Sequence, residues 1–151
     1  MAEILSIAQK KTIFAAIPSS FTINSVAVTA SKKYANQLVL DDDTAYPVIS
    51  LNHSQDGLKG IVDAGIGGVM FKGMLTIHVY SKSTSSLNGV AMGDGVAQGI
   101  IDTLKTWVTP LTGDIKVFHP TVDIHPVNYQ GLEPGLEGVH GFVFWVDLWH
   151  A

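Results

Sequence analysis

Two long stretches of the chain alternate apolar and polar side chains, and this alternation constrains the fold more than any other feature. In residues 69–81, one face carries Phe71, Leu75, Ile77 and Val79, and the other carries Lys72, Thr76, His78 and Tyr80. In residues 140–150, one face carries Phe142, Phe144, Val146 and Leu148, and the other carries Val143, Trp145, Asp147 and Trp149. A period of two over this length is typical of strands in a sheet with one covered face. The sequence therefore predicts a mainly antiparallel sheet that contains two long strands.

A helical pattern lies between these two strands, at residues 87–107. Its apolar stripe, spaced three and four residues apart, consists of Ala97, Ile100, Ile101, Leu104, Trp107 and Val108. The segment also contains Gly93, Gly95 and Gly99. Each glycine weakens a helix by about 1 kcal/mol relative to alanine, so we expect a close approach to a neighbouring element there. A shorter helix is predicted over residues 4–17, before Pro18.

The predicted fold class is α+β, with a mainly antiparallel sheet, one long helix packed on one face and a short N-terminal helix. A single domain is expected over residues 1–151. Further strands are predicted over residues 25–30, 37–40, 46–51, 114–119 and 122–127. Glycine, proline and polar residues predict loops over residues 52–68 and 130–137.

The composition excludes several kinds of function. The chain has no cysteine, which excludes disulfides, thiolate metal sites and cysteine nucleophiles. It has no arginine and a net charge of −4, which argues against a dedicated nucleic-acid reader. No segment approaches the ~20 apolar residues of a membrane span, and the first residues lack the pattern of a signal peptide. We therefore expect a protein that is made in, and stays in, a cytoplasm and has no membrane partner.

The polar faces of the two long strands indicate assembly. At ~3.3 Å per residue, strands of this length extend on the order of 40 Å. An outer face that bears Trp145 and Trp149 is difficult to leave in water over that distance, and large aromatic residues are enriched in interface cores. Charged residues make up only 15% of the chain, which is low for the surface of a monomer. We expect a partner subunit to cover this face.

Three local motifs resemble ligand sites, and each has a simpler interpretation. Residues 93–99 resemble a dinucleotide fingerprint, but they have one residue too many and lie inside the predicted helix. His119, Asp123 and His125 would share one face of an unbroken strand, but Pro120 interrupts it. The aspartates at 41–43 lack the spacing of a calcium loop. We predict no catalytic residue, no metal and no cofactor. An alternative is a small enzyme or ligand-binding domain that uses the two histidines, Asp123 and His140.

Four segments follow one another in the order of a known family of viral proteins. They are Ala45-Tyr-Pro-Val-Ile-Ser-Leu51 before a glycine-rich segment, Gly73-Met-Leu-Thr-Ile-His-Val-Tyr-Ser81, Ile100-Ile-Asp-Thr-Leu104 and Gly141-Phe-Val-Phe-Trp-Val-Asp-Leu148. With the N-terminal helix also in place, the chain resembles the tail-terminator (tail-completion) proteins of long-tailed bacteriophages and related archaeal viruses. The resemblance covers roughly residues 46–150 and rests on hydrophobic patterns; residues 26–40 fall outside it.

The resemblance implies a structural virion protein and no enzyme. Such proteins form a ring, typically a hexamer, that caps the head-proximal end of the tail tube, stops its polymerisation and joins the tail to the neck or connector. DNA would pass through the lumen without specific binding, since phosphate affinity comes from Lys and Arg. The alternative within the same class is another neck or tail-tube protein, whose subunits stack in many rings.

Two sets of residues are predicted to make the contacts of this ring. Tyr80, His78, Trp145 and Trp149 would lie at subunit or tube contacts. The glycine-rich residues 52–68, with Asp56, Lys59 and Asp63, would form a loop that reaches a tube subunit or the connector.

Overall fold

A five-stranded sheet forms the body of the protein. The computed structural model describes residues 5–41, 43–62, 69–111 and 115–150, and their side chains except those of 55–62, 69 and 70. The strand order is β3-β4-β5-β7-β6, with bounds Ser31–Tyr34, Val48–Val62, Val69–Lys82, Val139–His150 and Asn128–Leu132. The β3–β4 pair is parallel and the other pairs are antiparallel, as the predicted class requires. A separate antiparallel hairpin joins β1 (Ser20–Ile23) to β2 (Val26–Thr29).

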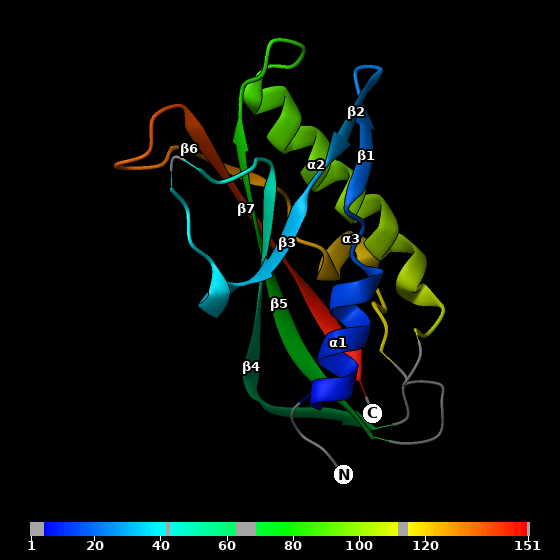
Figure 1. Cartoon of the computed structure of the whole chain (residues 1–151). Coiled ribbons are helices and arrows are strands. Elements are labelled where there is room, and N and C mark those ends of the chain that lie inside the picture. Colours follow the sequence, from blue (N-terminus) through cyan, green and yellow to red (C-terminus); the bar gives the residue numbers. More distant parts are fainter. Residues whose placement is uncertain (1–4, 42, 63–68, 112–114, 151) are drawn as a thin grey trace.

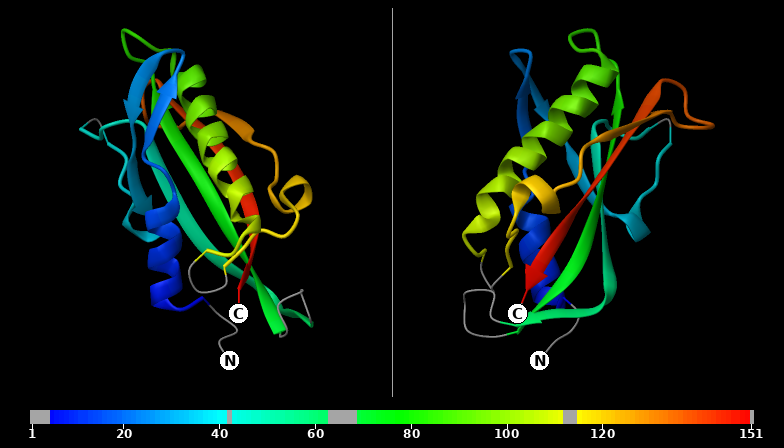
Figure 2. Two further views of the ribbon diagram at one scale, coloured as in Figure 1. Left: turned by 90° about the vertical axis from the view of Figure 1, so that its right-hand side faces the viewer. Right: turned by 180° about the vertical axis from the view of Figure 1, so that it is seen from behind.

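The helices α1 and α2 lie on one face of this sheet, and α3 lies beside the edge strand β7 (Figures 1 and 2). The N-terminal helix α1 (Ile7–Ala16) begins at a capping box made by Ser6 and Gln9. The long helix α2 (Gly89–Leu104) begins at Asn88, whose side chain accepts from two backbone N–H groups, and continues as the 3-10 helix η2 (Lys105–Val108). Two short pieces, η1 (Ala35–Gln37) and α3 (Pro120–Asp123), complete the set. None of the helices among the described residues is both long and apolar enough for a membrane crossing.

The core lies between α2 and the inner face of the sheet, and the predicted alternation of the long strands is confirmed. Leu75 pairs with Val146 and Ile77 pairs with Phe144 across β5 and β7, and all four side chains are buried on the face that meets the helices. The polar members of each strand face the opposite side, which we call the outer face. Burial of apolar residues on one side of a sheet therefore sets the register.

The glycines of α2 mark its closest approaches, as predicted from their helix-weakening cost. A Cβ atom at Gly93 would overlap the ring of Phe142 in β7. At Gly99 it would meet the ring of Phe21 in β1. Residues 93–99 are therefore a packing surface within a helix, and the strand-to-helix turn that a dinucleotide fingerprint requires is not found there.

The predictions for residues 25–40 are only partly confirmed. Residues 26–29 form a strand, but its partner β1 was not predicted, and Asn24 and Ser25 make the turn with positive φ values. A strand over residues 37–40 is wrong, because β3 comes earlier and the chain then turns through η1. Lys32 and Lys33 in β3 hide the apolar signal of a strand. The inward-facing Lys32 is accommodated because its ammonium group donates to backbone carbonyls at the C-terminal end of α1.

Two predictions near the C-terminus are wrong. Residues 122–127 do not form a strand: Pro120 starts the helical turn α3, and the Asp123 carboxylate accepts a hydrogen bond from the backbone N–H of His119. Within the described part of residues 114–119, only isolated bridges form. The predicted loop 130–137 begins with the last residues of β6.

The prediction of a loop over residues 52–68 is wrong for most of this range. The strand β4 continues to Val62 and pairs with β5, with a register shift between Gln55 and Gly60. The tertiary pairing therefore overrides the low strand propensity of glycine and aspartate. Residues 63–68 lie outside the described residues.

Candidate assembly interface

The outer face carries the four aromatic and imidazole side chains that the sequence places there. His78 and Tyr80 stand on β5, and Trp145 and Trp149 stand on β7, each partly exposed. Their shared face follows from the alternation, but the surroundings of each side chain come from other parts of the fold. The two tryptophans have aromatic neighbours from the segment after η2, whereas His78 and Tyr80 lie near Glu133.

The two tryptophans are partly covered by their own chain and remain partly exposed. The ring of Trp145 lies 4.9 Å from the imidazole of His125, centroid to centroid. Trp149 meets Phe118 edge-on at 5.6 Å, and its indole N–H donates to the Asp123 carboxylate at 3.3 Å. The segment that follows η2 thus supplies aromatic partners that the sequence pattern did not predict.

At the other end of the outer face, His78 and Tyr80 are half-buried. These two rings stack with a centroid distance of 5.9 Å, and Glu133 lies close enough to influence both. Burial lowers the pKa of His78, although the nearby Glu133 carboxylate opposes this effect. Burial, followed by the charge of Glu133, raises the pKa of Tyr80. Both side chains are therefore uncharged at neutral pH.

The remaining part of the outer face lies in its middle. It consists of the exposed or partly exposed residues Asn52, Ser54, Met74, Thr76, Trp145 and Asp147, which we call the open patch. Asp147 lies 3.6 Å from the Nζ of Lys72 and 3.8 Å from the Nε2 of His125. A mixed apolar and charged patch of this kind fits the composition of an oligomer contact.

The two edges of the sheet differ. The edge of β7 is covered by the same chain: β6 pairs with its first residues, and bridges from Ile124 to Val146 and from Lys116 to Trp149 cover the rest. The edge of β4 is not covered in this way. Although β4 has 15 residues, β3 pairs with only the four from Val48 to Leu51. In the described residues, the remaining backbone of β4 has a strand partner on one side only.

The predicted contact loop cannot be placed as a loop. Asp56 and Lys59 belong to β4, and their side chains lie outside the description. Asp63 lies outside the described residues altogether.

The residues of the alternative metal site do not meet. Asp123 is engaged by His119 N–H and by Trp149, whereas His125 lies beside Trp145 and Asp147. The Nδ1 of His140 lies 2.8 Å from the hydroxyl of Tyr129. Within the part of the chain that the structure describes, no three His, Asp or Glu side chains gather as metal ligands.

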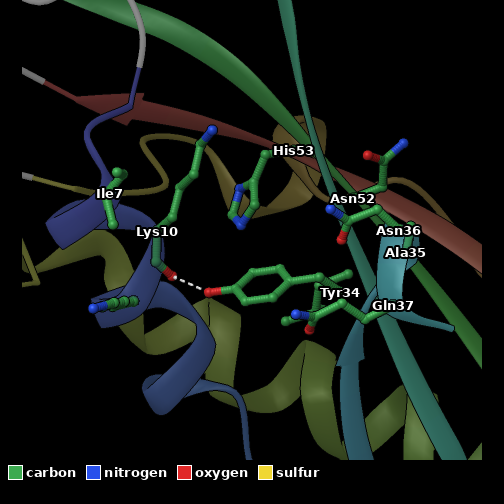
Figure 3. Close-up of a pocket in the computed structure, with 10 residues that line it drawn as sticks. Ile7, Lys10, Tyr34, Ala35, Asn36, Gln37, Asn52 and His53 are labelled. Carbon is green, nitrogen blue, oxygen red and sulfur yellow. Dashed lines mark hydrogen bonds between the residues drawn. The ribbon is translucent and has the colours of Figure 1, made fainter.

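A pocket of about 440 Å³ lies beside the open edge of β4, between α1, η1 and β4 (Figure 3). It is lined by Ile7, Lys10, Lys11, Tyr34, Ala35, Asn36, Gln37, Leu51, Asn52 and His53. Burial, followed by the positive charge of Lys10, lowers the pKa of His53 to about 4. We did not predict this site from the sequence. The available signal was that His53 continues the inward-facing series of Ile49 and Leu51, which places an imidazole on an apolar face.

The depressed pKa of His53 predicts a pH dependence of stability. Between pH 6.5 and about 4, the unfolded chain holds a proton on this imidazole and the folded chain does not. Acid therefore favours unfolding in this window, and the unfolding free energy should fall as the pH is lowered through it. Urea denaturation at several pH values should show a shallower slope for His53→Leu than for the wild type. Equal slopes would contradict the assignment.

A scan against models of protein families finds no match to this chain, and a search of curated proteins finds none either.

Proposed function

We propose that this protein is a structural subunit of a virion that assembles into a closed ring, a hexamer as its resemblance to tail terminators implies. The ring would sit at the head-proximal end of the tail tube, end its polymerisation and join the tail to the neck or connector. No catalytic step is part of this role. The sequence resemblance supplies the class of protein, and the fold supplies a physical reason for assembly.

The observation that carries the proposal is the edge of β4 beyond Leu51. A long strand with unpaired backbone groups on one side is a template for pairing with another chain, and soluble proteins usually cover or charge such edges. A closed ring with head-to-tail contacts covers the same edge in every copy. The open patch, which begins at Asn52 next to this edge, would then lie in the same contact.

Partners other than the protein itself follow from the same role. They are the tail tube protein and the neck or connector protein, while DNA only passes through the lumen. A chain with net charge −4 and no arginine offers little attraction to phosphates, so DNA would slide without sticking.

The test is the assembly state of the purified protein. Light scattering at tens of micromolar should give the mass of several copies, and electron micrographs should show single rings. The double variant Asn52→Lys/Ser54→Lys places charges at the β4 edge and should dissociate the ring, because lysines block edge pairing. Val90→Lys/Gln98→Lys adds the same charge on the exposed side of α2 and should leave the ring intact.

Three results would count against this proposal. A monomer at these concentrations would remove its physical basis. Long tubes in the micrographs would favour the alternative, a tail-tube protein. Rings that survive the double variant at β4 would show that the contact lies elsewhere.

A further inference from the structure

The pocket between α1 and β4 exists because β3 leaves the sheet early. β3 ends at Tyr34, η1 turns away, and β4 continues with α1 across the gap. Tyr34 forms one wall: its hydroxyl donates to the carbonyl oxygen of Lys10 at 3.4 Å, and its ring packs 4.7 Å from that of Phe14. Figure 3 shows the Lys10 side chain rising beside the imidazole of His53, with the Tyr34 ring next to both. The walls of the pocket are thus fixed by contacts among three elements.

An unpaired imidazole borders this pocket. The Nδ1 and Nε2 atoms of His53 are both buried, and neither has a hydrogen-bond partner in the described structure. Buried polar side-chain atoms normally have a partner, and a bound water or a ligand group would supply one here. A neutral imidazole offers one N–H donor and one acceptor nitrogen. A ligand oxygen in the pocket would satisfy this donor once the side chains that cover the imidazole nitrogens move aside.

The charge of the pocket is opposite to that of the chain. The protein carries a net charge of −4, yet the described lining residues include Lys10 and Lys11 and no carboxylate. Neither lysine forms an ion pair with a described carboxylate. Two ammonium groups without a counter-charge among the described residues raise the local concentration of anions.

The volume of the pocket and its apolar lining residues indicate what kind of molecule would fill it. A volume of about 440 Å³ lies within the usual range for small-molecule pockets and exceeds what a bare inorganic anion fills. Ile7, Leu51, Ala35 and the Tyr34 ring provide apolar surface, and the amides of Asn36 and Gln37 lie at the η1 side.

We propose that the pocket between α1 and β4 binds a small organic carboxylate, with His53 and Lys10 holding the carboxylate group and the apolar walls holding the body. The binding is reversible and involves no covalent step. Carboxylate binding does not require ring formation, so the result of its test is independent of the proposed function.

The test uses the full chain and a set of defined probes: benzoate, hexanoate, the neutral analogue benzamide, and inorganic phosphate. NMR titration at neutral pH should show that both carboxylates shift the resonances of His53, Tyr34 and α1. Benzamide, which lacks the charge, and phosphate, which lacks the apolar body, should bind about tenfold more weakly or not at all. The bound carboxylate should also raise the pKa of His53, because a nearby negative charge favours the imidazolium.

Variants locate the binding groups. Lys10→Gln and His53→Leu should each weaken benzoate binding about tenfold. Lys33→Gln removes the same charge from an exposed residue on the opposite face of the sheet and should leave the affinity unchanged. If His53→Leu does not fold, the rise in the His53 pKa of the wild type tests the same contact. The proposal is overturned if neither carboxylate shifts these resonances at tens of millimolar, or if Lys33→Gln weakens binding as much as Lys10→Gln.

Discussion

Replacing Phe144 by alanine is expected to lower the unfolding free energy by about 3–5 kcal/mol. Phe144 is fully buried and stands opposite Ile77 at the centre of the β5–β7 ladder. The removed ring leaves a cavity that the rigid sheet and α2 can fill only in part. Since a domain of this kind has about 5–15 kcal/mol of stability in total, much of the population should unfold at modest urea concentrations. Urea denaturation followed by circular dichroism measures the loss.

Two controls frame this result. Phe144→Leu keeps most of the volume and should cost clearly less than the alanine variant. Val122→Ala truncates a side chain that is 70% exposed and should change stability by no more than about 0.5 kcal/mol. If Phe144→Ala were as stable as Val122→Ala, the core between α2 and the sheet would be wrongly placed.

Replacing Lys32 by methionine is expected to cost about 2–3 kcal/mol, because Lys32 ties α1 to the sheet. Its Nζ donates to the carbonyl oxygens of Phe14 and Ile17, at 2.7 and 2.8 Å, and lies 4.9 Å from the centre of the Phe14 ring. These carbonyls stand at the C-terminal end of α1, where a positive charge also favours the helix dipole. Methionine keeps the apolar stem but removes the charge and both hydrogen bonds.

The neighbouring lysine provides a matched control. Lys33→Met changes an exposed side chain on the outer face and should alter stability by about 0.5 kcal/mol or less. Hydrogen exchange should show faster exchange in α1 for Lys32→Met and no change for Lys33→Met. Unchanged exchange in α1 for both variants would mean that other contacts hold this helix. The same loosening should weaken carboxylate binding, since α1 forms one wall of the proposed pocket.

The candidate interface was predictable only in part. The alternation places Tyr80, His78, Trp145 and Trp149 on one face, and the structure has them there. Their exposure was not predictable, because it depends on Phe118, His125 and Glu133, which fold back from distant parts of the chain. The open edge of β4 was hidden for a related reason: a glycine-rich sequence has low strand propensity, and only its pairing with β5 makes it a strand.

The sequence by itself determined the elements whose pattern records burial on one side. Residues 69–81, 140–150 and 87–107 carry periods of two and of about 3.6, and each forms the predicted strand or helix, because the periodicity is a local consequence of facing one core. The tertiary structure alone decided the conformation of the segments at the edges of that core. It determined that Pro120 starts a helical turn, that β3 ends at Tyr34, and that Lys10, Tyr34 and His53 meet around one pocket. These outcomes depend on contacts between residues far apart in the chain, and no local pattern encodes them.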